Sequence, residues 1–274
     1  MNKLRSYQNE IIRRIKQLEL GFDVTIIGEI SFGHFTYPLY RIGAGNNNGQ
    51  KKKKDVLISG IVHGDEPAGG LAVLQFLDHL AYKYLDRFNF FCYPCVNPSG
   101  FETNMRVNMD YVNLNRHFEE PPNTQEFKHI LNSLRRGPDR YHLTIDLHEC
   151  PPFAIDPKEK YLPKDNPHEF WMWETSLANS GLRIGDKVIA KLVSNGVPVC
   201  RWPRIYDDIN NGGVIWYPDG NVNKFYAAGT SFEGYLYSNR TDHSFTIETP
   251  TLWELSRRIE VQIQALCLIL ELSL

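Results

Sequence analysis

The apolar positions of this chain alternate between strand-like and helix-like segments. Residues 56–62 are nearly all apolar, which is typical of a strand buried on both faces of a sheet. Pro67 then begins a helical pattern in which leucines recur at positions 71, 74, 77 and 80. The alternation continues downstream and predicts strands at residues 88–93, 143–147, 197–200 and 245–247, and helices at 124–136, 185–195 and 252–270.

Strands that alternate with helices predict a parallel or mixed sheet covered by helices on both faces. The chain has 274 residues, and with about 150 residues per domain this length allows between one and two domains. We expect one α/β domain over residues 1–274. Residues 1–32 offer one amphipathic helix at most, which we expect as an N-terminal extension, and residues 43–54, with their run of lysines, are expected to form an exposed loop.

The composition argues against several classes of protein. The formal net charge of −2 disfavours a nucleic-acid-binding protein, which usually carries a basic excess. No uncharged run reaches the roughly 18 residues of a membrane span, and the N-terminal ten residues are too polar for a secretion signal. Five cysteines then indicate free thiols in a reducing compartment, so we expect a cytoplasmic protein. The C-x-x-C at residues 92–95 lies in an apolar run and is interpreted as core.

Polar side chains follow the predicted strands at the edge where α/β sheets bind ligands. His63 and Glu66 follow the first predicted strand. His148 directly follows the strand predicted at residues 143–147, and Glu248 ends the last strand. Imidazole and carboxylate groups are the ligands of catalytic zinc sites, which use three protein ligands and leave one position open. Asp146 or a backbone carbonyl could orient an imidazole from behind. Each of these residues alone could equally have a structural role, but together they indicate a metal site.

Two further features suit hydrolytic chemistry. Glu248 could take a proton from a metal-bound water and return it to a leaving amine. The segment 106–118 carries two arginines and several asparagines between a strand and a helix, and arginine suits carboxylate recognition and oxyanion stabilisation. Taken alone, that segment also fits a surface loop whose arginines pair with Glu119 and Glu120.

Together these residues resemble the zinc carboxypeptidase superfamily. They follow its order: H-x-x-E at residues 63–66, an arginine, an Asn-Arg pair, a strand-end histidine and a late strand-end glutamate. The chain is similar to bacterial murein peptide amidases and, more distantly, to aspartoacylase and succinylglutamate desuccinylase. The resemblance covers residues 37–250 and implies a three-layer α/β/α fold with a mixed, mostly parallel central sheet. The motifs that carry it lie at residues 37–40, 63–69, 97–100 and 106–118.

The resemblance also implies roles for individual residues. It implies one zinc ion bound by His63, Glu66 and His148, with Glu248 as general base and Arg106 polarising the scissile carbonyl. Asn115 and Arg116 would grip the terminal carboxylate of the substrate. Tyr206 would be the tyrosine that covers the substrate, with Tyr235 and Tyr237 as alternatives.

The expected activity is that of a zinc metallocarboxypeptidase or peptide amidase, which cleaves a peptide or amide bond beside a free C-terminal carboxylate through attack of zinc-bound water. An alternative is an N-acyl amino-acid deacylase like aspartoacylase or succinylglutamate desuccinylase, which the short spacing of 81 residues between Glu66 and His148 favours. Another is a relative that binds metal without catalysis. The expected partner is a peptide or an acylated amino acid.

Some questions stay open at this level. The oligomeric state and the preferred substrate side chain are not predicted. Three tryptophans could line a specificity pocket, although core packing is the commoner use of this residue; they are Trp171, Trp173 and Trp202. Three acids could hold a second ion, although solvated surface acids are the simpler interpretation; they are Asp65, Glu149 and Asp207.

Overall fold

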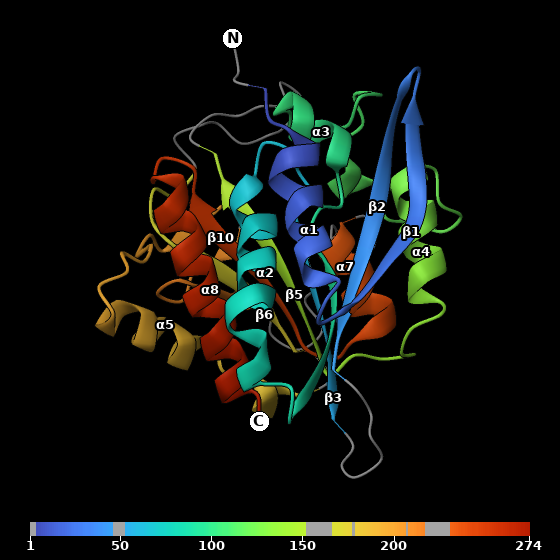
Figure 1. The fold of residues 1–274 in the computed structure, drawn as a ribbon. Helices are drawn as coiled ribbons and strands as arrows, with labels where there is room; N and C mark the ends of the chain where they lie inside the picture. Colours follow the sequence, from blue (N-terminus) through green and yellow to red (C-terminus); the bar gives the residue numbers. More distant parts are fainter. Residues whose placement is uncertain (1–3, 46–52, 152–165, 177–178, 207, 217–230) are drawn as a thin grey trace.

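A mixed eight-stranded sheet forms the middle layer of the protein (Figure 1). The computed structural model describes residues 4–45, 53–151, 166–176, 179–206, 208–216 and 231–274. In spatial order the strands are β1 (Asp23–Phe32), β2 (Phe35–Ala44), β4 (Phe88–Tyr93), β3 (Lys54–Gly60), β5 (Leu143–Cys150), β10 (Ser244–Pro250), β6 (Trp171–Thr175) and β9 (Val214–Trp216).

The core of this sheet is parallel. β3 pairs in parallel with both β4 and β5, and β5 pairs in parallel with β10, so the carboxyl ends of these strands share one edge. Antiparallel pairs flank the core: β1 with β2, β2 with β4, and β10 with β6. The expected mixed, mostly parallel sheet is therefore confirmed.

Helices cover both faces of the sheet (Figure 1). One face carries α1 (Arg13–Leu18), α2 (Pro67–His79), α5 (Gly185–Ser194) and α8 (Leu255–Leu272), in which α8 packs against α2 and β10. The other face carries α4 (Gln125–Leu134) and α7 (Phe232–Arg240), which meet through Phe127 and Tyr235. Shorter elements connect them: η1 (Gln8–Ile12), η2 (Ala81–Lys83), α3 (Pro98–Thr103), η3 (Leu114–Arg116), η5 (Ser180–Leu182), and the hairpin of β7 (Arg204–Ile205) and β8 (Asp208–Ile209).

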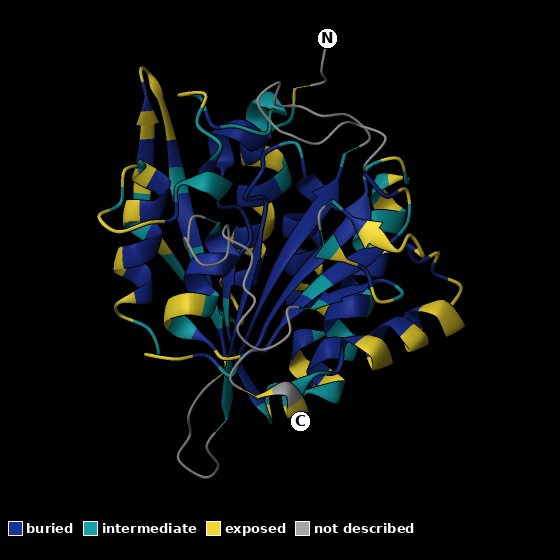
Figure 2. Ribbon diagram, turned by 180° about the vertical axis from the view of Figure 1, so that it is seen from behind, coloured by how far each residue is buried: buried dark blue, intermediate teal, exposed yellow. Residues whose placement is uncertain are grey.

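The central strands are buried, whereas exposed residues gather on the outer helices and the β1–β2 hairpin (Figure 2). Helix α2 packs so closely on the sheet that a Cβ at Gly69 would lie 2.3 Å from the carbonyl oxygen of Leu147. Glycine at this position is therefore a packing requirement. All five cysteines are free, and Cys92 and Cys95 are buried as expected for core residues. No helix in the described part of the chain is long and apolar enough to span a membrane.

Several predicted elements need correction. The helical extension expected over residues 1–32 ends at Leu18, and β1 follows as an edge strand. The strand expected at residues 197–200 is absent, since Val199 makes only an isolated bridge with Phe170. The last helix starts at Leu255, and Leu252 lies before it, 56% exposed. Of the expected loop at 43–54, the first two residues belong to β2 and Lys54 begins β3, while residues 46–52 lie outside the described part.

Candidate metal centre

Local structure brings His63 and Glu66 to the carboxyl edge of the sheet. After β3 the chain turns through Ile61, whose φ of 51° is in the left-handed region that β-branched residues rarely adopt. Glu66 is the N-cap of α2, and its N–H donates to the carbonyl oxygen of His63. Gly64 lies against α3, where a Cβ would be 1.9 Å from the carbonyl carbon of Gly100. The strained turn and the tight contact hold both side chains in place.

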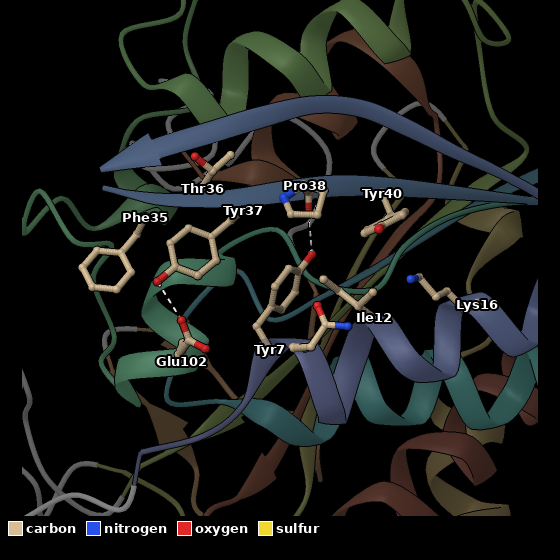
Figure 3. A pocket seen from close by; sticks show the side chains of 10 residues that line it. Tyr7, Ile12, Lys16, Phe35, Thr36, Tyr37, Pro38, Tyr40 and Glu102 are labelled. Atoms are coloured by element: carbon tan, nitrogen blue, oxygen red, sulfur yellow. Dashed lines mark hydrogen bonds between the residues drawn. The ribbon is translucent and has the colours of Figure 1, made fainter. Parts of the chain in front are cut away.

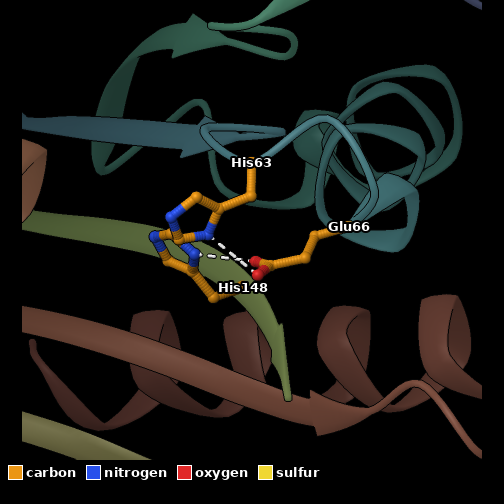
Figure 4. Close-up of side chains that lie close together, drawn as sticks. All are labelled: His63, Glu66 and His148. Atoms are coloured by element: carbon orange, nitrogen blue, oxygen red, sulfur yellow. Dashed lines mark hydrogen bonds and ion pairs between the residues drawn. The ribbon is translucent and has the colours of Figure 1, made fainter. Parts of the chain in front are cut away.

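The three predicted ligands converge (Figure 4). His63 Nδ1 lies 2.8 Å from Glu66 Oε1, and His148 Nδ1 lies 2.8 Å from Glu66 Oε2. One ligand atom from each residue lies within 4.8 Å of the other two, and all three residues are at most 3% exposed. Two imidazole nitrogens and a carboxylate oxygen, buried together at the ends of strands, are a donor set that fits a divalent transition metal such as zinc.

A second carboxylate orients His148 from behind. Asp146 Oδ2 lies 2.9 Å from His148 Nε2, and Asp146 Oδ1 accepts a hydrogen bond of 2.6 Å from the Ser59 hydroxyl. This contact places the ring proton on Nε2 and leaves the Nδ1 lone pair for a metal ion. Burial opposes a charged imidazole, but the negative charges of Asp146 and Glu66 raise the pKa of His148 well above its ordinary value. The orienting role predicted for Asp146 matches this geometry.

The other two ligands have perturbed protonation as well. Burial and the nearby charge of Arg106 lower the pKa of His63 to about 3, so its imidazole is neutral, as metal binding requires. Burial acts to raise the pKa of Glu66, but the two histidines beside it hold that pKa well below its usual range. Glu66 also accepts hydrogen bonds from Arg106 Nη1 at 2.8 Å and from the backbone N–H of Glu149 at 3.0 Å.

Glu248 lies directly beside the centre. It pairs in register with His148 on the adjacent parallel strand, so both side chains point to the same face of the sheet. It is 9% exposed, and burial raises its pKa to about 8, with the charge of Glu66 acting in the same direction. A carboxyl with such a pKa can exchange protons near neutral pH.

Asn115 and Arg116 belong to η3, which lies beside the start of α7, and α7 packs on β5 and β10 on the face that carries His148 and Glu248. The side-chain oxygen of Asn115 accepts from the N–H of Phe232 at 2.9 Å, and Arg116 Nη1 donates to the carbonyl oxygen of Asn115 at 2.8 Å. Their loop is organised by buried Asn108, which donates to Glu126 at 3.1 Å. The sequence analysis assigned no role to Asn108, although this residue lies within the motif at residues 106–118.

Of the three tyrosine candidates, Tyr206 contacts the strand that carries His148. It occupies the turn between β7 and β8, and its hydroxyl is 3.8 Å from the sulfur of Cys150, two residues beyond His148. Burial, with the charges of Cys150 and Glu248 beside it, raises the pKa of Tyr206 well above its usual value. Tyr235 instead donates to Glu120 at 2.7 Å and packs within the α4–α7 layer. Tyr237 also lies on α7.

Among the described residues, the three ligands form the one cluster able to hold a metal ion. Burial raises the pKa of Asp65 to about 7, and Glu149 is paired with Arg258, so neither completes a second cluster. Asp207 lies outside the described residues. Trp171 is fully buried in a small apolar cluster against which Trp173 packs, whereas Trp202 is 37% exposed.

A surface hollow of about 270 Å³ lies elsewhere, between β2 and the first helical turns (Figure 3). It contains none of the three ligands. Tyr37 and Tyr40, which belong to the motif at residues 37–40, line it, and the Tyr37 hydroxyl donates to Glu102 on α3 at 2.7 Å. These tyrosines therefore join β2 to the N-terminal helix and α3 rather than to the metal centre.

Comparisons with known proteins agree with this architecture. A family model for the succinylglutamate desuccinylase/aspartoacylase catalytic domain matches residues 52–151, the segment that contains all three ligands. No curated protein matches this chain.

Solved structures match over nearly the whole chain. A candidate metallopeptidase from Shewanella amazonensis SB2B is 23% identical with a TM-score of 0.70, covering 95% of this chain and 92% of its own. A metallo-carboxypeptidase from Pseudomonas aeruginosa, in complex with (2-guanidinoethylmercapto)succinic acid, is 16% identical with a TM-score of 0.64 (96% and 68% covered). Carboxypeptidase A from Helicoverpa armigera is 15% identical with a TM-score of 0.62 (99% and 74% covered). The chain thus has the fold of these metallopeptidase and carboxypeptidase structures, and its residues 52–151 match the succinylglutamate desuccinylase/aspartoacylase family model.

Proposed function

We propose that this protein is a zinc-dependent hydrolase that cleaves a peptide or amide bond next to a free C-terminal carboxylate. The observation that carries the proposal is the convergence of His63, Glu66 and His148, with Glu248 in register beside His148. Zinc held by these residues would polarise the scissile carbonyl and lower the pKa of a coordinated water.

The remaining residues supply proton transfer and binding. Glu248, whose pKa burial raises to about 8, would accept a proton from the attacking water and pass it to the leaving nitrogen. Arg106 reaches the centre through Glu66 and would stabilise the oxyanion that develops on the carbonyl. Asn115 and Arg116, on η3 beside the start of α7, would bind the substrate carboxylate, since a guanidinium group can bind it through two hydrogen bonds. Tyr206 would cover the substrate from the β7–β8 turn.

A second activity is favoured by one observation, the match of residues 52–151 to the succinylglutamate desuccinylase/aspartoacylase domain. In an N-acyl amino-acid deacylase the same metal centre would cleave an amide whose nitrogen belongs to a free amino acid. The two activities share every residue discussed above and differ in the acyl group that must be accommodated. Substrate assays, rather than the metal centre, distinguish them.

The test combines metal analysis with a substrate panel. We expect about one zinc ion per chain, lost in His148→Ala, and hydrolysis of short peptides faster than of N-succinyl and N-acetyl amino acids. Glu248→Gln should retain the zinc and lose about 10²–10⁴-fold in kcat, the usual contribution of a general base. Faster cleavage of the acylated amino acids would favour the deacylase. A zinc-loaded protein that hydrolyses neither class would contradict both activities and leave a non-catalytic metal-binding protein.

A further inference from the structure

Helix α8 packs behind the metal centre, on the face of the sheet opposite to Glu248 and His148. From this helix two polar side chains, Arg258 and Gln262, reach the ends of β5 and β10. They are four residues apart and therefore lie on the same side of the helix. Gln262 is fully buried, and the Arg258 side chain is 12% exposed.

Arg258 acts on Glu66 through Glu149. Glu149 follows His148 on β5, so its side chain points to the α2–α8 face. One of its oxygens forms an ion pair with Arg258, and the other accepts the N–H of Ala68 in the first turn of α2 at 2.6 Å. Glu66, the N-cap of α2, makes no capping hydrogen bond because its side chain is turned to the histidines. The Glu149 carboxylate thus supplies the N-terminal hydrogen bond of α2 that the Glu66 side chain does not make. The backbone N–H of Glu149 also donates to Glu66 Oε2.

Gln262 hydrogen-bonds to residues near the carboxyl ends of both β5 and β10. Its side-chain amide donates to the carbonyl oxygen of His148 at 2.9 Å and to the hydroxyl of Thr249 at 2.9 Å. Thr249 is the residue after Glu248. One buried amide group therefore joins the strand that carries a candidate ligand to the strand that carries the proposed general base.

We infer that Arg258 and Gln262 are positioning residues for the metal centre, and this inference rests on the proposed function. Neither touches the substrate face. Arg258 holds the Glu149 carboxylate that fixes the start of α2 and hence Glu66, and Gln262 sets the spacing between His148 and Glu248. Charged and amide groups that support ligands in this way commonly change metal affinity by 10- to 100-fold when removed.

The test measures metal affinity separately from folding. Arg258→Met and Gln262→Met remove the polar contacts with little change in length. Arg257→Met and Gln264→Met make the same substitutions on the same helix, at side chains whose hydrogen bonds within the described part of the chain go to Glu260. Co²⁺ affinity is measured by the visible absorption of the bound ion at a temperature where circular dichroism shows each variant folded. We expect a Kd at least about 10-fold higher for Arg258→Met and Gln262→Met, with both controls within about twofold of the parent.

A purely structural role predicts a different result. Arg258→Met and Gln262→Met would then lower the unfolding midpoint of the metal-free protein while the Kd for Co²⁺ stayed within twofold of the parent, which would overturn the inference. Arg258→Lys keeps the charge and should recover most of the affinity, so the test stands even if Arg258→Met does not fold. A parent chain that binds no Co²⁺ would overturn the proposed function as well, whereas normal binding by the parent and all variants would overturn only the positioning role.

Discussion

Asp146→Asn tests how the metal centre is tuned. Asp146 is 1% exposed and accepts hydrogen bonds from His148 Nε2 at 2.9 Å and from Ser59 at 2.6 Å. Asparagine has nearly the same shape. Its side-chain oxygen can still accept from His148, and the Ser59 hydroxyl can accept from the new amide group. The substitution therefore removes one negative charge and leaves the packing in place.

The cost follows from the change in that hydrogen bond. A bond to a charged group contributes about 1.5–3 kcal/mol, and a neutral one about 0.5–1.5 kcal/mol. The difference, about 1–2 kcal/mol, corresponds to roughly a 5- to 30-fold loss of metal affinity. This loss applies when His148 is neutral and the Nδ1 lone pair is free to bind.

Proton competition makes the effect depend on pH. In the metal-free protein the charges of Asp146 and Glu66 raise the pKa of His148, so the metal ion must displace a proton at and below neutral pH. Asparagine removes one of those charges and lowers this pKa, which relieves part of the competition. The ratio of the variant Kd to the parent Kd should therefore be largest at high pH and should shrink as the pH falls.

The assay is a zinc competition titration with a chromophoric chelator between pH 6 and 9. Asp78→Asn is the matched control, because Asp78 also lies beside a histidine, His79, but both side chains are exposed at the end of α2 opposite to Glu66. The control should bind zinc like the parent. The His148→Ala variant should lose zinc, which shows that the titration reports on this site. If it does, an Asp146→Asn Kd for zinc within twofold of the parent value at pH 9 would refute the orienting role of Asp146.

Three further changes test other parts of the structure. With zinc supplied at a saturating concentration, Arg106→Ala should lower kcat by about 10²–10³-fold with a smaller change in KM, as measured by steady-state kinetics against Arg257→Ala; an unchanged kcat would remove Arg106 from oxyanion stabilisation. Gly64→Ala should lower the free energy of unfolding in urea by about 1–3 kcal/mol or more, because the added Cβ meets the backbone of Gly100, whereas Gly21→Ala, with open space around it, should change it by less than about 0.5 kcal/mol; equal effects would contradict the tight turn. Burial raises the pKa of Glu126, so its stabilising contribution is present at low pH and is lost as the pH rises through the folded pKa. Glu126→Gln should therefore stabilise the metal-free protein in urea at pH 7.5 but not at pH 4, and a stabilisation that does not change with pH would contradict this assignment.

The elements that sequence analysis located well are those whose pattern is local. The strand predicted at residues 88–93 coincides with β4, and the helices begun by Pro67 and predicted at 185–195 coincide with α2 and α5 to within a residue or so. A continuous apolar run indicates a strand buried on two faces, and apolar residues spaced three and four apart indicate a helix buried on one. Neither pattern depends on a distant partner. The same local logic placed His63, Glu66 and His148 at strand ends.

The edge strands show where local patterns fail. β1 and β9, the two edge strands of the sheet, were not predicted, because burial of an edge strand is set by its neighbours and its alternation is irregular; β1 carries a register shift between Ile26 and Gly28. The segment 197–200 is apolar enough for a strand, but it packs beside Phe170 through a single bridge instead of joining the sheet. Tertiary packing overrides propensity at such positions.

The sequence by itself determined the alternating α/β architecture and the chemical types available at the carboxyl edge of the sheet, because both depend on short-range periodicity. Only the tertiary structure decided which of those groups meet. The parallel register of β5 and β10 places Glu248 beside His148 across 100 residues of chain, and the packing of α8 brings Arg258 and Gln262 behind the ligands. Register and helix docking are set by long-range burial, which leaves no local pattern in the sequence.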